Sequence, residues 1–136
     1  MSRFLVSTSV WSLAYRRETL PDVPQIAVLR SALVDGGYVA MTGMVLLELL
    51  RGFIPARAQE RIVTDLAALE LIEPTRDDYA EAARLANTCR QAGVQFGSVD
   101  ALLAQLAIAN DLELLTTDLD FDNAATLVPF HVWKPS

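Results

Sequence analysis

Short apolar runs alternate with longer segments of helical periodicity along the whole chain. The first run, Phe4-Leu-Val-Ser7, leads through small hydroxylated residues into a stretch compatible with a helix. Similar runs recur at intervals and are bounded by Gly, Pro or polar residues. They predict five strands, over 4–7, 38–41, 70–73, 112–116 and 130–133.

Between these runs, apolar residues recur every three or four positions, as at Ile26, Leu29 and Leu33. The stretch 18–24 holds two prolines and is predicted to be a loop. Because strands alternate with helices, the sheet is expected to be mostly parallel. Helices are predicted over 9–16 or 9–17, 25–34, 42–52, 56–69, 75–92 and 99–110, with a short helix or turn over 121–127.

Capping residues mark several of these helix starts. Thr42, Thr75 and Ser98 are predicted N-caps, and Pro55 is predicted as the first residue of its helix. The segment 99–110 is apolar on nearly every face, which predicts a buried helix.

Composition limits the class of protein. The chain has 136 residues, the size of one domain over 1–136, and 52% of them are hydrophobic, enough for a core. No run is long enough to span a membrane, and no signal peptide is recognised. The single cysteine, Cys89, suits a reducing cytoplasm and a packing role.

The net charge of −6 argues against a protein that binds nucleic acid through overall positive charge. A polyanionic partner would need cations or local arginines at the contact. Arg16, Arg51 and Arg57 are candidates for such contacts, although arginines on helix surfaces are commonly just solvated.

Four positions stand out by their place in the predicted elements. Ser7 ends the first strand, Glu48 lies within a leucine run, Asp100 falls in the first turn of the buried helix, and Asp118 follows the fourth strand. Each of the three acids has an ordinary explanation: a solvent-facing helix position for Glu48, a favourable helix dipole for Asp100 and a solvated turn for Asp118. Three acids that converge at the carboxyl ends of the strands would repel one another unless cations bind there.

The motifs around these positions resemble those of the PIN-domain ribonucleases, and within them the VapC-type toxins of toxin–antitoxin pairs. The resemblance extends over nearly the whole chain. The matching stretches are Phe4-Leu-Val-Ser-Thr-Ser-Val-Trp11, Leu46-Leu-Glu-Leu-Leu-Arg-Gly52, Gly97-Ser-Val-Asp-Ala-Leu-Leu-Ala104 and Leu114-Leu-Thr-Thr-Asp-Leu-Asp-Phe121.

The resemblance implies a three-layer α/β/α fold around a parallel sheet of four or five strands. It also implies RNA cleavage with one or two Mg²⁺ ions, or Mn²⁺ as a substitute, a VapB-like antitoxin, and a homodimer or a toxin–antitoxin hetero-oligomer. Carried over by position, Glu48, Asp100 and Asp118 match family acids. Accessory positions are Thr8, Ser98, Thr116 and Asp120, with Asp122 at most accessory.

Position 7 departs from the resemblance, because the family has Asp where this chain has Ser. A neutral hydroxyl supplies no charge to a metal ion, so we expect lower metal affinity and slower turnover. Losing one well-placed electrostatic group commonly lowers a rate by a factor on the order of 10²–10³. An engineered substitution and a natural divergence toward binding alone both explain Ser7.

Other interpretations stay open. Asp118-Leu-Asp120 is similar to the metal site of nucleotide-sugar transferases, but no glycine-rich phosphate loop accompanies it. A non-enzymatic module that binds antitoxin or RNA is a second alternative, and His131, the sole histidine, is expected at an exposed edge. Apolar residues in excess of a small core would serve partner binding or ordinary packing; they are Ile26, Leu29, Leu33, Leu46, Leu50 and Ile62.

Overall fold

The computed structural model describes residues 2–16, 23–53 and 55–136. Its centre is a five-stranded sheet with the order β3-β2-β1-β4-β5, in which every neighbouring pair is parallel. The prediction of a parallel sheet is confirmed, with the first strand in the middle. The strands are β1 (Arg3–Val6), β2 (Tyr38–Met41), β3 (Glu70–Leu71), β4 (Glu113–Leu115) and β5 (His131–Val132).

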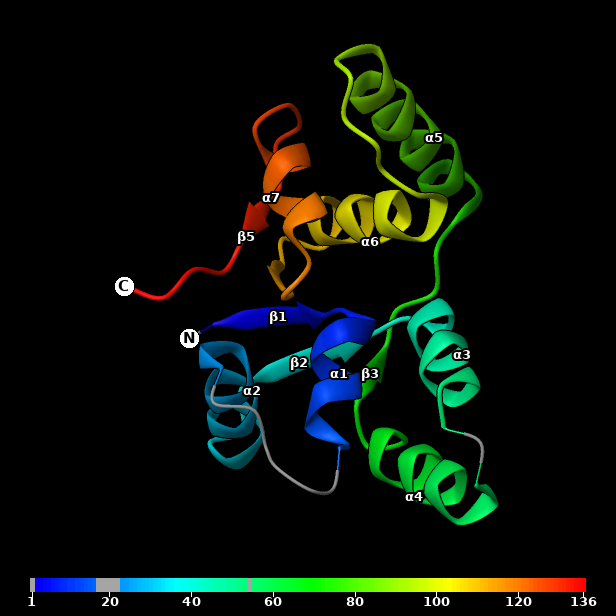
Figure 1. The fold of residues 1–136 in the computed structure, drawn as a ribbon, viewed down its shortest axis with the longest axis vertical. Coiled ribbons are helices and arrows are strands. Elements are labelled where there is room, and N and C mark those ends of the chain that lie inside the picture. The colour runs from blue at the N-terminus through cyan, green and yellow to red at the C-terminus, as the bar shows by residue number, and fades with distance from the viewer. Residues whose placement is uncertain (1, 17–22, 54) are drawn as a thin grey trace.

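Seven helices occur in the described residues and complete a three-layer α/β/α arrangement. In Figure 1, α5, α6 and α7 lie on one side of β1, whereas α1, α2 and α4 lie on the other. The helices are α1 (Thr8–Ala14), α2 (Pro24–Val34), α3 (Gly43–Arg51), α4 (Ala56–Leu66), α5 (Arg76–Gln91), α6 (Ser98–Ala109) and α7 (Leu119–Ala125).

The core is built on β1 and α6. Leu5 and Val6 are fully inaccessible to solvent, as expected for a central strand covered on both faces. Six residues of α6 are buried, which confirms the prediction from its all-round apolar sequence. Cys89 is buried as well, in agreement with a packing role.

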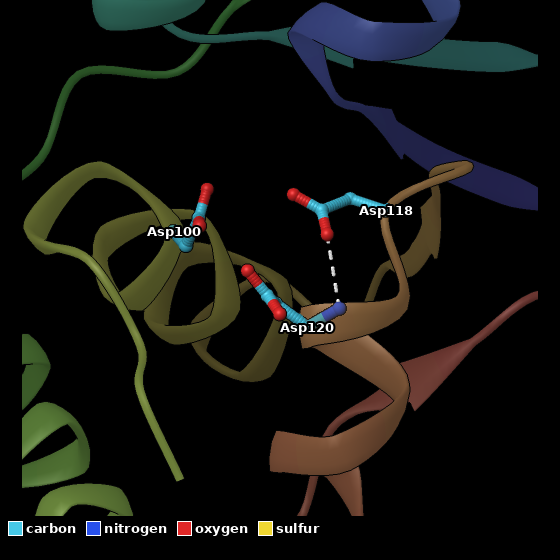
Figure 2. A group of neighbouring side chains, drawn as sticks. All are labelled: Asp100, Asp118 and Asp120. Atoms are coloured by element: carbon cyan, nitrogen blue, oxygen red, sulfur yellow. Dashed lines mark hydrogen bonds between the residues drawn. The ribbon is translucent and has the colours of Figure 1, made fainter.

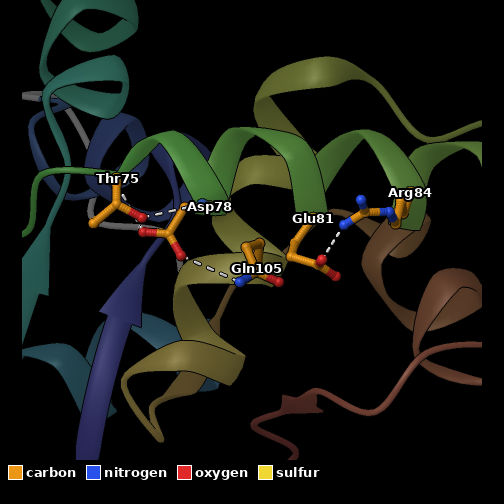
Figure 3. Close-up of polar contacts among 5 residues, drawn as sticks. All are labelled: Thr75, Asp78, Glu81, Arg84 and Gln105. Carbon is orange, nitrogen blue, oxygen red and sulfur yellow. Dashed lines mark hydrogen bonds and ion pairs between the residues drawn. The ribbon is translucent and has the colours of Figure 1, made fainter.

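Capping at α5 follows the sequence. The Thr75 hydroxyl accepts the Asp78 backbone N–H at 3.1 Å, and the Asp78 carboxylate accepts the Thr75 N–H at 2.9 Å (Figure 3). The same carboxylate also accepts a hydrogen bond from Gln105 of α6 at 3.2 Å. This capping box therefore links α5 to α6 as well as starting α5.

Two predicted helix starts need correction, and a third predicted cap lacks its side-chain hydrogen bond. Gly97, not Ser98, is the N-cap of α6, and Ser98 is the first residue of that helix. Thr42 holds the N-cap position of α3, but its side chain makes no capping hydrogen bond. Pro55 is the N-cap of α4, and its helix begins one residue later because the Pro55 backbone is extended.

Of the two explanations offered for the apolar residues of helices α2 to α4, ordinary packing holds for most of them. Ile26, Leu29 and Ile62 are buried in the core, and Leu33 alone of the six proposed residues is exposed. Helical periodicity could not separate residues that pack in the core from residues that contact a partner, because both kinds of helix face are apolar. Most of the predicted loop 18–24 lies outside the described residues, as does Arg17. Among the described helices, none combines the length and hydropathy that crossing a membrane requires.

Candidate metal centre

The candidate site lies where β1 and β4 end. The two strands are parallel neighbours, and the Ser7 N–H continues their ladder by donating to the Leu115 carbonyl at 3.0 Å. Because parallel strands end at the same edge of the sheet, this register brings Ser7 and Thr116 together. Both side chains are buried, at 3% exposure each.

Three carboxylates gather beside this edge. Asp100, Asp118 and Asp120 each offer an oxygen, and these oxygens lie within 4.8 Å of one another. Figure 2 shows Asp100 projecting from the start of α6 toward the two aspartates at the start of α7. Asp118 is the N-cap of α7, and its carboxylate accepts the Asp120 N–H at 2.9 Å. Asp120, which we expected to be accessory, is therefore a full member of this cluster.

Glu48 approaches the cluster from α3 without joining the 4.8 Å group. Its carboxylate accepts a hydrogen bond from the Thr8 hydroxyl at 2.7 Å, and this bond holds it at the start of α1. Its charge still acts on Asp100. Two sequence-predicted residues, Thr8 and Glu48, thus lie at the margin of the carboxylate cluster.

Crowding of negative charge perturbs Asp100 strongly. Partial burial, followed by the neighbouring charges of Asp118, Glu48 and Asp120, raises the pKa of Asp100 from 3.8 to about 6. At neutral pH a carboxyl group with this pKa is mostly ionised, and its negative charge is held at an energetic cost that a nearby positive charge would offset. Asp100 is therefore a group that a bound cation would stabilise.

A chain of hydroxyl groups links the strand ends beneath the carboxylates. The Thr117 N–H and hydroxyl both donate to Ser9 Oγ, at 3.3 and 3.0 Å. Ser9 Oγ lies 3.0 Å from Ser7 Oγ, and Ser7 donates to Thr116 Oγ1 at 2.9 Å. Thr116 Oγ1 also accepts the Asp118 N–H at 3.1 Å. Through this last bond the hydroxyl chain positions Asp118.

Ser9 and Thr117 were not expected in the site. Their sequence signal is weak, because hydroxyl residues that follow a strand also serve as ordinary N-caps of the next helix. Ser98 is exposed at the start of α6, next to the N-cap rather than in the hydroxyl chain. The three candidate arginines, Arg16, Arg51 and Arg57, are exposed and lie on separate helices, α1, α3 and α4, or directly after them.

The donor set fits a hard divalent cation. All three clustered ligands are carboxylate oxygens, the ligands that Mg²⁺ and Mn²⁺ prefer, whereas softer metals select sulfur or imidazole. The described residues place no cysteine or histidine among these ligands. The raised pKa of Asp100 is a second sign that the cluster is built for a positive charge.

The fold is shared with solved toxin–antitoxin structures. VapBC2 from Rickettsia felis, bound to a DNA fragment from its promoter, superposes with a TM-score of 0.74 at 22% identity, covering 96% of this chain and 98% of that one. DNA-bound VapBC from Salmonella typhimurium gives 0.76 at 17%, covering 98% of both chains.

A third structural relative is VapC20 of Mycobacterium tuberculosis, a sarcin-ricin loop cleaving toxin. Its TM-score is 0.68 at 18% identity, covering 92% of this chain and 96% of that one. No curated protein matches the chain in sequence. A model of the PIN domain matches residues 4–127, nearly the whole length, and the chain therefore belongs to the PIN domain family.

Proposed function

We propose that this protein is the toxin of a toxin–antitoxin pair and an endoribonuclease that depends on Mg²⁺ or Mn²⁺. The observation that carries the proposal is the convergence of Asp100, Asp118 and Asp120 at one strand edge. The high pKa of Asp100 supports it, because such a cluster is unfavourable without a cation. The similarity to VapC20, which cleaves the sarcin-ricin loop, makes RNA the preferred substrate class.

Each residue has a defined task in this proposal. Asp100, Asp118 and Asp120 hold the cation, and Thr116 positions Asp118 through its backbone N–H. Glu48, held by the Thr8 hydroxyl, has the task of accepting a proton from the attacking water. A divalent cation, when bound, polarises the phosphoryl oxygens and neutralises the charge that develops in phosphodiester cleavage.

Ser7 is the reason to expect low activity. Its hydroxyl adds no negative charge beside the cluster, and it is occupied by hydrogen bonds to Ser9 and Thr116. A carboxylate at position 7 is compatible with these neighbours, because the hydroxyls of Ser9 and Thr116 can rotate and both donate to it. Restoring the carboxylate is thus a test that the local structure permits.

The decisive experiment compares S7D with S7N in the cleavage of a sarcin-ricin loop RNA with Mn²⁺. The two variants have nearly the same shape and differ in charge. We expect S7D to cleave faster than the unmodified chain by a factor on the order of 10², and S7N to show no gain. The double variant S7D/D118N controls for contaminating nuclease. Equal rates for S7D and S7N would refute the role given to position 7.

A catalytically silent binding module is the second candidate, and the neutral, fully hydrogen-bonded Ser7 favours it. Mn²⁺ titration separates the two candidates. The nuclease requires the cation to bind to the unmodified chain, however weakly, whereas a module that only binds a partner requires no cation.

A VapB-like antitoxin in the cytoplasm is the partner we propose, because the structural relatives include VapBC complexes. Helices α3 and α4 each expose one large apolar side chain, Leu47 and Val63. The test is co-expression with a small candidate antitoxin, followed by size-exclusion chromatography of the unmodified chain and of L47D. Formation of a stable complex supports a partner in either candidate function, and the elution volume of the free chain reports whether it forms a homodimer.

A further inference from the structure

A cavity of about 450 Å³ opens next to the carboxylate cluster and lies outside it. It is lined by the last turns of α5 and by the segment that connects α5 to α6, which runs back along α5 in Figure 1. Its volume falls within the range of about 300–1,000 Å³ that is typical of small-ligand sites. The lining residues used below are Arg90, Phe96 and Gly97.

Gly97 joins this cavity to the proposed metal centre. A Cβ atom at Gly97 would lie 3.9 Å from the Asp100 Oδ2 atom, so this end of the cavity borders the cluster directly. The segment from Gly93 to Gly97 spans at most about 14 Å. A ligand whose reacting group lies at Asp100 therefore reaches the cavity with a neighbouring part of the same molecule.

The far end of the cavity carries a positive charge. Arg90 lies in the last turn of α5 and is exposed. Within residues 2–16, 23–53 and 55–136, the ion pairs of the structure involve Arg61, Arg84 and Lys134 but leave the Arg90 guanidinium free. A guanidinium without an ion-pair partner is suited to binding a phosphate group.

An aromatic ring lines the wall of the same cavity. Phe96 is partly exposed, and two buried rings hold it in place: Phe121 in an edge-to-face contact at 5.4 Å and Phe130 in a stacked contact at 6.3 Å. A ring fixed in this way loses little entropy when a planar group packs against its open side. Bases of single-stranded nucleic acid bind proteins by stacking of this kind.

We infer that this cavity binds the nucleotide next to the scissile phosphate of a single-stranded RNA, with Arg90 on its phosphate and Phe96 against its base. The inference rests on the proposed nuclease function, because that function is what directs the RNA strand through the site at Asp100. It also explains how a chain with a net charge of −6 engages a polyanion, because one local arginine and the cation face the strand.

The test is RNA binding by R90Q, with R84Q as the matched control. Arg84 lies on the same helix, is exposed and pairs with Glu81 instead of lining the cavity. Binding of a fluorescent single-stranded RNA is measured in EDTA, so that cleavage does not interfere. R90Q should raise the Kd about tenfold and lower the slope of log Kd against log salt by about 0.7, the loss of one phosphate contact. R84Q should stay within about twofold of the unmodified chain.

A second variant separates the base from the phosphate. F96L keeps an apolar side chain against the two buried rings and removes the stacking surface. It should weaken binding of adenosine monophosphate several-fold and leave binding of ribose 5-phosphate unchanged, whereas R90Q should weaken both. Thermal unfolding of each variant checks that the fold is intact, and R90K should recover part of the affinity lost in R90Q.

Equal loss of affinity in R90Q and R84Q would overturn the inference, because the arginines would then act only as general charge. Unchanged RNA binding in R90Q would overturn it as well. Failure of this inference and failure of the proposed function are distinguishable: an Arg90 effect without cleavage by S7D would leave the nucleotide site standing and count against the role given to position 7. Cleavage by S7D without an Arg90 effect would do the reverse.

Discussion

Replacing Asp100 by Asn should make the metal-free protein more stable at neutral pH. The pKa of Asp100 is raised from 3.8 to about 6, which corresponds to about 3 kcal/mol between the two protonation states. Because this carboxyl is only partly buried, screening by water lowers the effect on stability to about 1.5 kcal/mol. Asparagine has nearly the same shape and carries no charge, so it removes the repulsion without opening a cavity.

The sign and the pH window follow from the direction of the shift. A raised pKa in the folded state gives stability that is present below the unfolded value of 3.8 and lost as the pH rises through about 6. The advantage of D100N should therefore be complete above pH 7 and fall to about one third of its full size at pH 4.5.

Urea unfolding in EDTA at pH 4.5, 6.0 and 7.5 measures this difference. With an m-value of about 1.5 kcal/mol/M, the midpoint of D100N should lie about 1 M above that of the unmodified chain at pH 7.5. D111N is the matched control, because Asp111 is exposed, has a φ of 52° that asparagine also tolerates, and lies outside the carboxylate cluster. Two results would refute the electrostatic reasoning. One is a D100N variant that is less stable than the unmodified chain at pH 7.5, and the other is a gain in stability of the same size at every pH.

Three further predictions concern the cation, the Thr8–Glu48 hydrogen bond and the helix cap at Thr75. Mn²⁺ at about one hundred times its Kd should stabilise the chain by about 2.7 kcal/mol and raise Tm by roughly 10 °C; D118N should abolish most of this shift in differential scanning fluorimetry. T8V should lower the rate of RNA cleavage by S7D by about 10–100-fold with little change in Mn²⁺ affinity, because Glu48 loses the hydroxyl that orients it; an unchanged rate would refute the role given to Glu48. T75A should lower the free energy of unfolding by about 1 kcal/mol without changing the Mn²⁺ response, since the capping box with Asp78 lies on α5, away from the cluster.

The sequence alone determined the fold to a large extent. The spacing of apolar residues distinguishes the strands from the helices of this chain, and strands alternate with helices. A parallel α/β sheet then follows from the rules that govern connections between strands. The capping box at Thr75 was also readable, because both of its hydrogen bonds join residues three positions apart. Local interactions of this kind leave a direct trace in the sequence.

The tertiary structure alone decided how the acids are grouped. Asp120 joins Asp100 and Asp118, whereas Glu48 stays at the margin, and spacing along the chain does not encode that difference. The same is true of the hydroxyl chain from Thr117 through Ser9 and Ser7 to Thr116, which spans two strand ends more than 100 positions apart, at separations of 108 and 109 residues. The physical reason is that burial and charge repulsion depend on distances between separate elements, and these distances exist only once the sheet register and the helix packing are set.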